Sequence, residues 1–180
     1  MTAALACALL LLGDAATSAP PQYQGEIRLG WPDSGGTVTA SLPDTSWVLE
    51  IGAPGFAVER NEMMPDGRRY VLASNRDSGV IVSVYLERVP PEAKHADCAQ
   101  YLRNWIASNG QHFQIKNVRP LKLGEVESVE FTVPIVAKEL GNTKVQQENV
   151  VGCMARDDVY VDIHVSKMSL KPVEGSALRT

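Results

Sequence analysis

An alternation of apolar and polar residues runs through most of this chain and constrains its fold more than any other feature. In the segment 80–86, the valines and the leucine occupy every second position, and the segment 159–165 repeats the pattern with Val159, Val161, Ile163 and Val165. A period of two is typical of β-strands that bury one face. Because short turns separate such segments, neighbouring strands should pair antiparallel. The sequence therefore predicts an α+β domain built mainly on an antiparallel β-sheet meander.

Further strands are expected wherever the pattern recurs between turn residues. In chain order the expected strands are 26–31, 37–42, 47–51, 56–63, 69–75, 80–86, 114–121, 129–135, 144–155 and 159–167. The first two flank Pro32-Asp-Ser-Gly-Gly36, whose residues all favour turns, and they could form a hairpin.

One segment has the period of a helix. Its apolar residues follow the spacing i, i+3, i+4, i+7 and i+8, at Cys98, Tyr101, Leu102, Trp105 and Ile106. Such a stripe is typical of a helix with one buried side, and Asn109-Gly110 supplies a helix end. We therefore expect one amphipathic helix at about residues 94–109, packed on one face of the sheet.

The N-terminal residues have the pattern of an export signal. Ala3–Leu12 is an apolar run, too short for the roughly 20 residues that span a bilayer, and small residues follow it up to a possible cleavage site after Ser18. No basic residue precedes the run, so a buried N-terminal helix remains an alternative. Lipidation at Cys7, which follows Ala4-Leu5-Ala6, is another. We expect a periplasmic or secreted protein with no membrane span. Its parts are a signal peptide at 1–18, an extension with the possible hairpin at 19–45, a single α+β domain at 46–170 and a tail at 171–180.

Two cysteines remain once the signal is removed, and oxidising compartments preserve disulfides. Cys98 belongs to the apolar stripe of the helix, and Cys153 lies on the more apolar face of its strand, together with Val145 and Val151. Both sulfurs should therefore point into the interface between helix and sheet. The sequence predicts a disulfide between Cys98 and Cys153.

Asp162 and His164 are two residues apart on an expected strand, so they share a face with Tyr160 and Ser166. A histidine and a carboxylate can begin a zinc site, but zinc takes three or four ligands, and no other histidine has a spacing that completes one. We interpret these four residues as a solvated polar face, since antiparallel sheets commonly keep one face wet. No catalytic, cofactor or metal site is predicted.

Composition excludes one class of partner. The 17 basic and 21 acidic residues are spread along the chain and form no basic block, which argues against nucleic-acid binding.

Trp31 and Trp47 could be core residues or an exposed platform for a ligand.

The segments 47–56 (WVLEIGAPGF), Asp66-Gly67 and 79–85 (GVIVSVY) resemble the opening of PsbP-like proteins, relatives of a photosystem II extrinsic subunit. The similarity extends over about residues 47–167 as a layout, and its local motif is Pro54-Gly55-Phe56. The resemblance implies an antiparallel sheet between helices and a non-catalytic protein that acts by association with other proteins.

Together these observations favour an exported, non-enzymatic domain with a binding or accessory role in the cell envelope. Its partner would be a protein or a small apolar ligand. Two alternatives remain: a carrier that holds a small apolar ligand between helix and sheet, and a hydrolase whose site has no recognisable motif.

Overall fold

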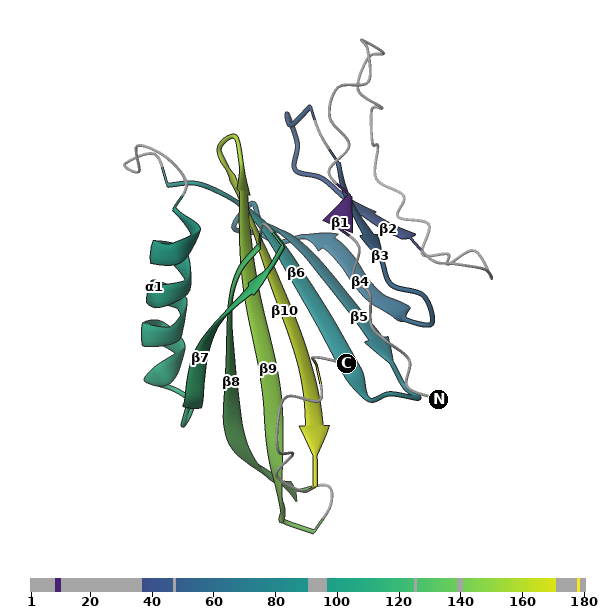
Figure 1. The fold of residues 1–180 in the computed structure, drawn as a ribbon. Helices are drawn as coiled ribbons and strands as arrows, with labels where there is room; N and C mark the ends of the chain where they lie inside the picture. The colour runs from purple at the N-terminus through teal and green to yellow at the C-terminus, as the bar shows by residue number, and fades with distance from the viewer. Residues whose placement is uncertain are drawn as a thin grey trace.

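The structure is a computed structural model that describes residues 9–10, 37–46, 48–90, 97–124, 126–138, 141–170 and 178. It contains a seven-stranded and a three-stranded antiparallel sheet and one helix (Figure 1). The large sheet has the order β4-β5-β6-β10-β9-β8-β7. Its strands are β4 (Ala57–Met63), β5 (Arg69–Asn75), β6 (Val80–Arg88), β7 (Lys116–Leu123), β8 (Val126–Ala137), β9 (Thr143–Arg156) and β10 (Val159–Ser169).

Most of these strands follow the predicted ranges, and the prediction of a mainly antiparallel sheet with one helix is confirmed. The order of the strands departs from a simple meander. Strands β4–β6 form one meander and β7–β10 another, and the two join where the last strand, β10, pairs with β6, with Val84 opposite Ile163. Residues about 80 positions apart thus become neighbours. Local sequence patterns do not predict this pairing, because they relate only residues close together in the chain.

The small sheet has the order β1-β3-β2, with β1 at Leu9–Leu10, β2 at Thr37–Ala40 and β3 at Leu49–Gly52. Strand β2 pairs with β3, while the first arm of the expected hairpin lies outside the described residues. Of the expected signal peptide the structure describes only β1, which pairs with β3. Trp31 and Trp47 also lie outside the described residues.

One face of the large sheet, here called the closed face, packs against the small sheet. The two sheets share a core made of the alternating apolar residues of β2, β3, β5, β6 and β10, including Leu49, Val84 and Leu86. Val38, Ala40 and Leu42 belong to this core, so residues 37–42 pack with the domain although they were expected in an N-terminal extension. The alternation in β10 has its expected outcome: Val159, Val161 and Ile163 all face this core.

The other face, here called the helix-side face, carries the helix α1 (Cys98–Gly110). The helix begins later than the expected residue 94, because Asp97 has an extended backbone and caps the helix by accepting a hydrogen bond from the Gln100 backbone N–H at 2.9 Å. Leu102 is its one buried residue, and the other members of the apolar stripe are half-buried. Within the described part of the chain, no helix is long and apolar enough to cross a membrane.

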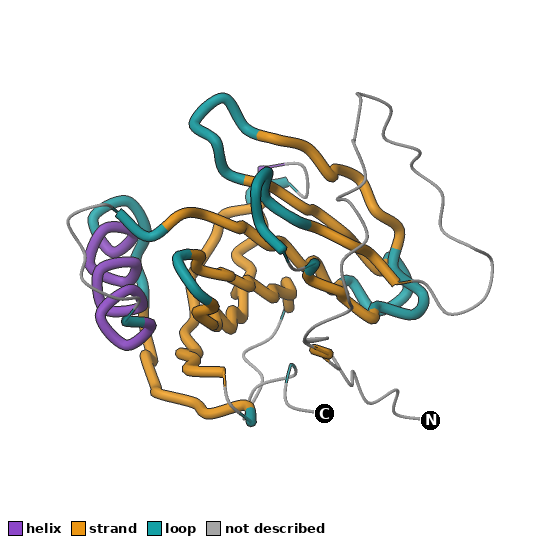
Figure 2. The backbone as a smooth tube through the Cα atoms, turned by 90° about the horizontal axis from the view of Figure 1, so that it is seen from above, coloured by secondary structure: helices purple, strands orange, loops and turns teal. Residues whose placement is uncertain are grey.

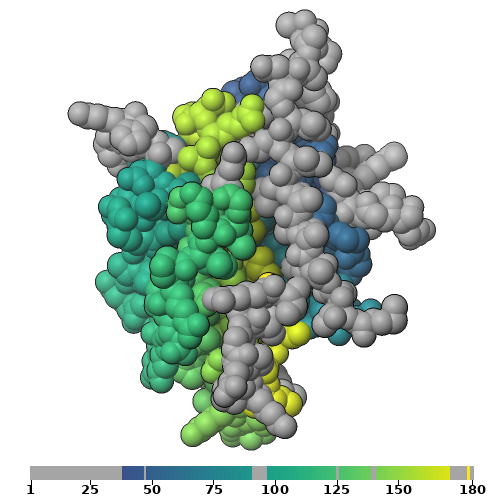
Figure 3. Space-filling model, in the orientation of Figure 1, coloured from purple at the N-terminus to yellow at the C-terminus, as the bar shows by residue number. Residues whose placement is uncertain are grey.

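The helix covers only part of this face. It contacts β9 and β8, and it stands at the end of the molecule away from β4 and β5 (Figures 1 and 2). In the space-filling view, α1 and β7 form one flank of the surface (Figure 3). The helix-side face of β5 and β6 is therefore not covered by α1.

Candidate functional site

The predicted disulfide is present. The sulfurs of Cys98 and Cys153 lie 2.01 Å apart, with a Cα–Cα distance of 5.4 Å. Cys153 is 1% exposed and lies on the helix-side face of β9, as its register with Val151 predicted. The bond ties the first residue of α1 to the sheet and so places the next turn of the helix beside β10.

The four polar residues of β10 share one face as predicted, but the prediction that this face is solvated is wrong. Tyr160, Asp162 and Ser166 are buried, and His164 is half-buried. The reason is the position of β10 in the centre of the sheet, between β6 and β9, with α1 beside it. The ring of Tyr160 packs 4.8 Å from that of Tyr101 on α1, and its hydroxyl accepts a hydrogen bond from the Asp97 backbone N–H at 3.0 Å.

Asp162 is the most deeply buried acid of this face, at 4% exposure. The Tyr101 hydroxyl donates a hydrogen bond to Asp162 Oδ2 at 3.1 Å, whereas Oδ1 is buried without a hydrogen-bond partner among the described residues. Burial raises the pKa of Asp162 to about 7, and the hydrogen bond from Tyr101 opposes that rise. Burial also raises the pKa of Tyr101, with the charge of Asp162 as a further cause. Asp162 is thus poised to gain or lose its proton near neutral pH.

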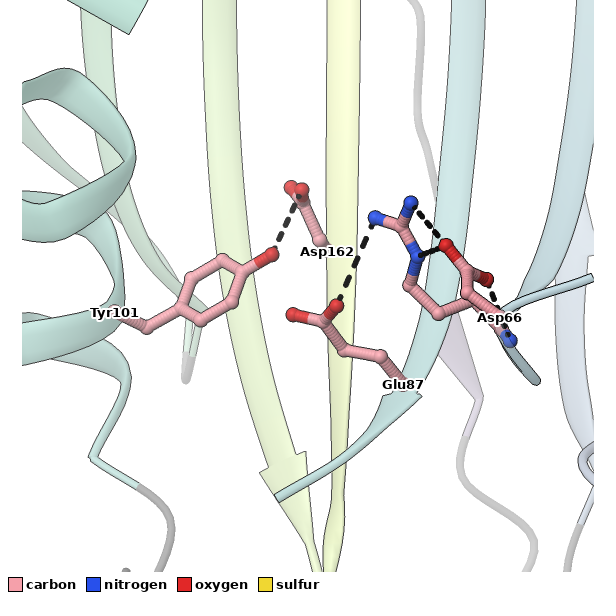
Figure 4. A network of polar contacts seen from close by, with 5 residues as sticks. Asp66, Glu87, Tyr101 and Asp162 are labelled. Carbon is pink, nitrogen blue, oxygen red and sulfur yellow. Dashed lines mark hydrogen bonds and ion pairs between the residues drawn. The ribbon is translucent and has the colours of Figure 1, made fainter. Parts of the chain in front are cut away.

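Glu87 lies between Tyr101 and Asp66 in this cluster (Figure 4). Glu87 is on β6, and Arg68 lies in the turn between β4 and β5, with 3.9 Å between Arg68 Nη1 and Glu87 Oε2. Arg68 also pairs with Asp66, where Nη2 lies 2.7 Å from Oδ2. This hydrogen-bonded pair lowers the pKa of Asp66 and raises that of Arg68. Arg68 is thereby held near Glu87 on β6.

Two tyrosines complete the site on β5 and β6, which α1 does not cover. Tyr70 and Tyr85 are register partners on β5 and β6, and their rings stack with centroids 4.6 Å apart at an angle of 27°. The guanidinium carbon of Arg68 lies 5.0 Å from the centroid of the Tyr85 ring, a cation–π geometry. We call Arg68, Tyr70 and Tyr85 the tyrosine strip.

His164 occupies a separate place on the same face. Its Nε2 lies 2.9 Å from Asn149 Oδ1, an acceptor, so Nε2 carries the ring proton. The ring lies among aromatic neighbours, 5.8 Å from Trp105 and 6.4 Å from Phe131 between centroids. Burial lowers the pKa of His164 to about 4, so the imidazole is neutral at pH 7. The arrangement fixes one tautomer of a neutral ring.

No three His, Cys, Asp or Glu side chains gather into a possible metal site among the described residues. The sequence pattern did not single out Glu87 or the tyrosine strip. Glu87, Tyr70 and Tyr85 occupy positions that alternation assigns to the solvent face of their strands, and Arg68 lies in a turn. A usable indication was present: closing a hairpin at the turn before Val80 puts Tyr70 opposite Tyr85, as the observed register does.

The chain matches no protein-family model, no curated protein and no solved structure.

Proposed function

We propose that this chain is an exported, non-enzymatic domain with a binding or accessory role in the cell envelope, and that the tyrosine strip is its binding surface. The observation that carries the proposal is the stacked Tyr70–Tyr85 pair with Arg68 above it, on the part of the sheet that α1 leaves uncovered. Tyrosine and arginine, with tryptophan, are the residues enriched among those that dominate binding energy in protein interfaces. The two rings are held by their strands, so little side-chain entropy is lost on binding.

Two observations support export. The N-terminal sequence has the apolar run and small-residue site of a signal peptide, and the domain contains a disulfide of the kind that persists in oxidising compartments. A PsbP-like domain would also act through protein association, so that resemblance agrees with a binding role.

The hydrolase alternative has one observation in its favour, the pKa of Asp162 near 7, which suits a general base. Two features weigh against it. Asp162 is only 4% exposed and Tyr101 occupies one of its oxygens, while His164 is held by Asn149 and has a pKa too low for a base at neutral pH. The carrier alternative requires room between helix and sheet, where Leu102, Trp105 and Phe131 already pack together.

Site-specific photocrosslinking in a host that exports the protein tests the proposal. A photoreactive residue at Tyr70 should give a discrete crosslinked species that disappears when Tyr85→Ala is added. The same residue at Val136, an exposed position on the far part of β8, is the matched control and should give none. Equal crosslinking from both positions, or none from Tyr70, would contradict the assignment of the surface. Intact-mass measurement of the exported protein should find the first 18 or so residues removed.

A further inference from the structure

The unpartnered oxygen of Asp162 lies at the inner end of the tyrosine strip. Buried polar atoms in native proteins nearly always have a hydrogen-bond partner, so an exception calls for an explanation. Asp162 is more than nine-tenths buried, and its carboxyl group lies at the Tyr101 hydroxyl, with Glu87 on the other side of that hydroxyl (Figure 4). A ligand that donates a hydrogen bond there would satisfy this atom.

The charges around Asp162 favour a cation. The groups that face it are Glu87 from β6, Tyr101 from α1 and Arg68 from the β4–β5 turn, while its neighbour on β9 is the disulfide-bonded Cys153. Arg68 is shared with Asp66, so when Asp162 is ionised three carboxylates face one guanidinium. The cluster is short of positive charge.

The geometry distinguishes between two kinds of cation. A guanidinium binds best to both oxygens of one carboxylate at once, but Asp162 has a single free oxygen because Tyr101 occupies the other. An ammonium group is a compact charge with three donors that can point to separate acceptors. Asp162 Oδ1, Glu87 and the Tyr101 hydroxyl are three such acceptors on three different elements.

We propose that this cluster binds a primary alkylammonium group, with Asp162 and Glu87 as its anionic partners and the rings of Tyr85 and Tyr101 along its alkyl stem. A lysine side chain of a partner protein and a free alkylamine share this chemistry. The inference rests on the proposed function, since it names the chemical group that the binding surface would recognise. Lysine stems commonly lie along apolar and aromatic surface while the charge reaches a polar partner.

The cluster is partly exposed to solvent at Glu87 and Arg68. The side chains of Glu87 and Arg68 are 23% and 39% exposed, so the ammonium would approach Glu87 first. Arg68 lies 3.9 Å from Glu87, beyond a direct hydrogen bond, and can be displaced while it keeps its pair with Asp66. The ammonium then replaces Arg68 as the cation next to Glu87.

Binding should depend on pH through Asp162. Below pH 7 its carboxyl group is protonated and offers no charge to the ligand, and above pH 7 it is ionised. An alkylammonium remains charged through this range, as a lysine side chain does with its ordinary pKa of about 10.4. Affinity should therefore rise about tenfold or less for each pH unit up to about pH 8 and then level off.

Nuclear magnetic resonance titration of the mature, oxidised protein tests the inference. The probe is Nα-acetyl-lysine N-methylamide, added up to about 100 mM because a single group should bind in the millimolar range. Shifts should be centred on Asp162, Glu87 and Tyr101. The matched ligand Nα-acetyl-norleucine N-methylamide has a similar stem without the charge, and n-butylamine represents a free amine.

Asp162→Asn and Glu87→Gln should each weaken lysine-amide binding by about tenfold or more. Glu127→Gln, at an exposed carboxyl group on β8, should leave lysine-amide binding unchanged.

The lack of a localised shift at pH 8, equal binding of the norleucine compound, or unchanged affinity in both site variants would overturn the inference. If crosslinking from Tyr70 persists while lysine amide fails to bind, the binding surface stands without this ligand class. If lysine amide binds and crosslinking fails, the site stands without a protein partner.

Discussion

The two faces of the large sheet are stabilised in different ways. On the closed face, apolar side chains of five strands fill the space between two sheets, and Leu49, Leu86 and Val159 are fully buried. On the helix-side face, a smaller apolar cluster lies under α1 and is joined to the buried polar groups Asp162 and Asn149. A disulfide holds the helix there. The closed face therefore serves stability, while the helix-side face contains the groups whose charge can change.

The largest expected effect is the loss of the covalent tie on the helix-side face. In the chain-entropy model, a bridge across 55 positions in the sequence contributes about 4 kcal/mol, so Cys98→Ala should lower the free energy of unfolding by about that amount. Chemical denaturation in non-reducing buffer measures it. Hydrogen exchange should show α1 losing protection first, while the amides of β6 remain protected.

Reductant supplies the control for that experiment, because the parent protein loses its bridge as well. The difference between parent and Cys98→Ala should then nearly vanish. A difference that persists under reductant would mean that the cysteine contributes through packing and not through the bond.

Next in size is truncation of the closed face. Leu86→Ala removes a side chain of 0% exposure between two sheets. Because the two sheets cannot move together to fill the resulting cavity, the substitution should destabilise the protein by about 3 kcal/mol. Leu102→Ala, under a helix that can move, should have a smaller effect of about 2 kcal/mol.

Leu123→Ala is the matched control for both, since this leucine is 52% exposed at the edge strand β7, and its effect should stay within about 0.5 kcal/mol. Unfolding curves of the three variants settle the order. Equal losses in Leu86→Ala and Leu102→Ala would remove the distinction between the two faces.

The smallest expected effects, about 1.4 kcal/mol per pH unit, come from two buried groups on the helix-side face whose pH dependences oppose each other. Asp162 has a pKa of about 7 in the folded protein against an ordinary 3.8, so its contribution to stability falls as pH rises from about 4 to 7. His164 has a pKa of about 4 against an ordinary 6.5, so its contribution falls as pH drops from about 6.5 to 4. In the parent protein the two slopes partly cancel.

Removing either group should leave the pH dependence of stability that comes from the other group uncompensated. Relative to the parent, Asp162→Asn should gain stability as pH rises from 4 to 7, and His164→Gln should gain stability as pH falls from 6.5 to 4, each by up to about 1.4 kcal/mol for every pH unit. Denaturation at pH 4, 5.5 and 7 measures both. Parallel curves for the two variants would show that these groups do not titrate as their burial implies.

Much of the local structure could be predicted from the sequence, because neighbouring residues determine it. The range of β5 was predicted residue for residue, and the alternation in β10 correctly assigned Val161 and Ile163 to an apolar face. The disulfide was predicted because the helix stripe and the strand register each constrain the direction of one sulfur. The exposure of Asp162 was predicted wrongly, because the period of a strand separates its two faces without saying what covers either of them.

By itself, the sequence determined which residues form strands, which segment forms the helix, and which side chains share a face. The tertiary structure decided that β10 lies between β6 and β9 and that β2 and β3 form a second sheet over the closed face. It also decided that the N-terminal part of α1 lies beside β10. The physical reason is that alternation and helical spacing act between residues close in the chain, whereas the pairing of β6 with β10 joins segments far apart. The cluster of Asp162, Tyr101 and Glu87 combines residues from three such segments, so it exists only in the folded protein.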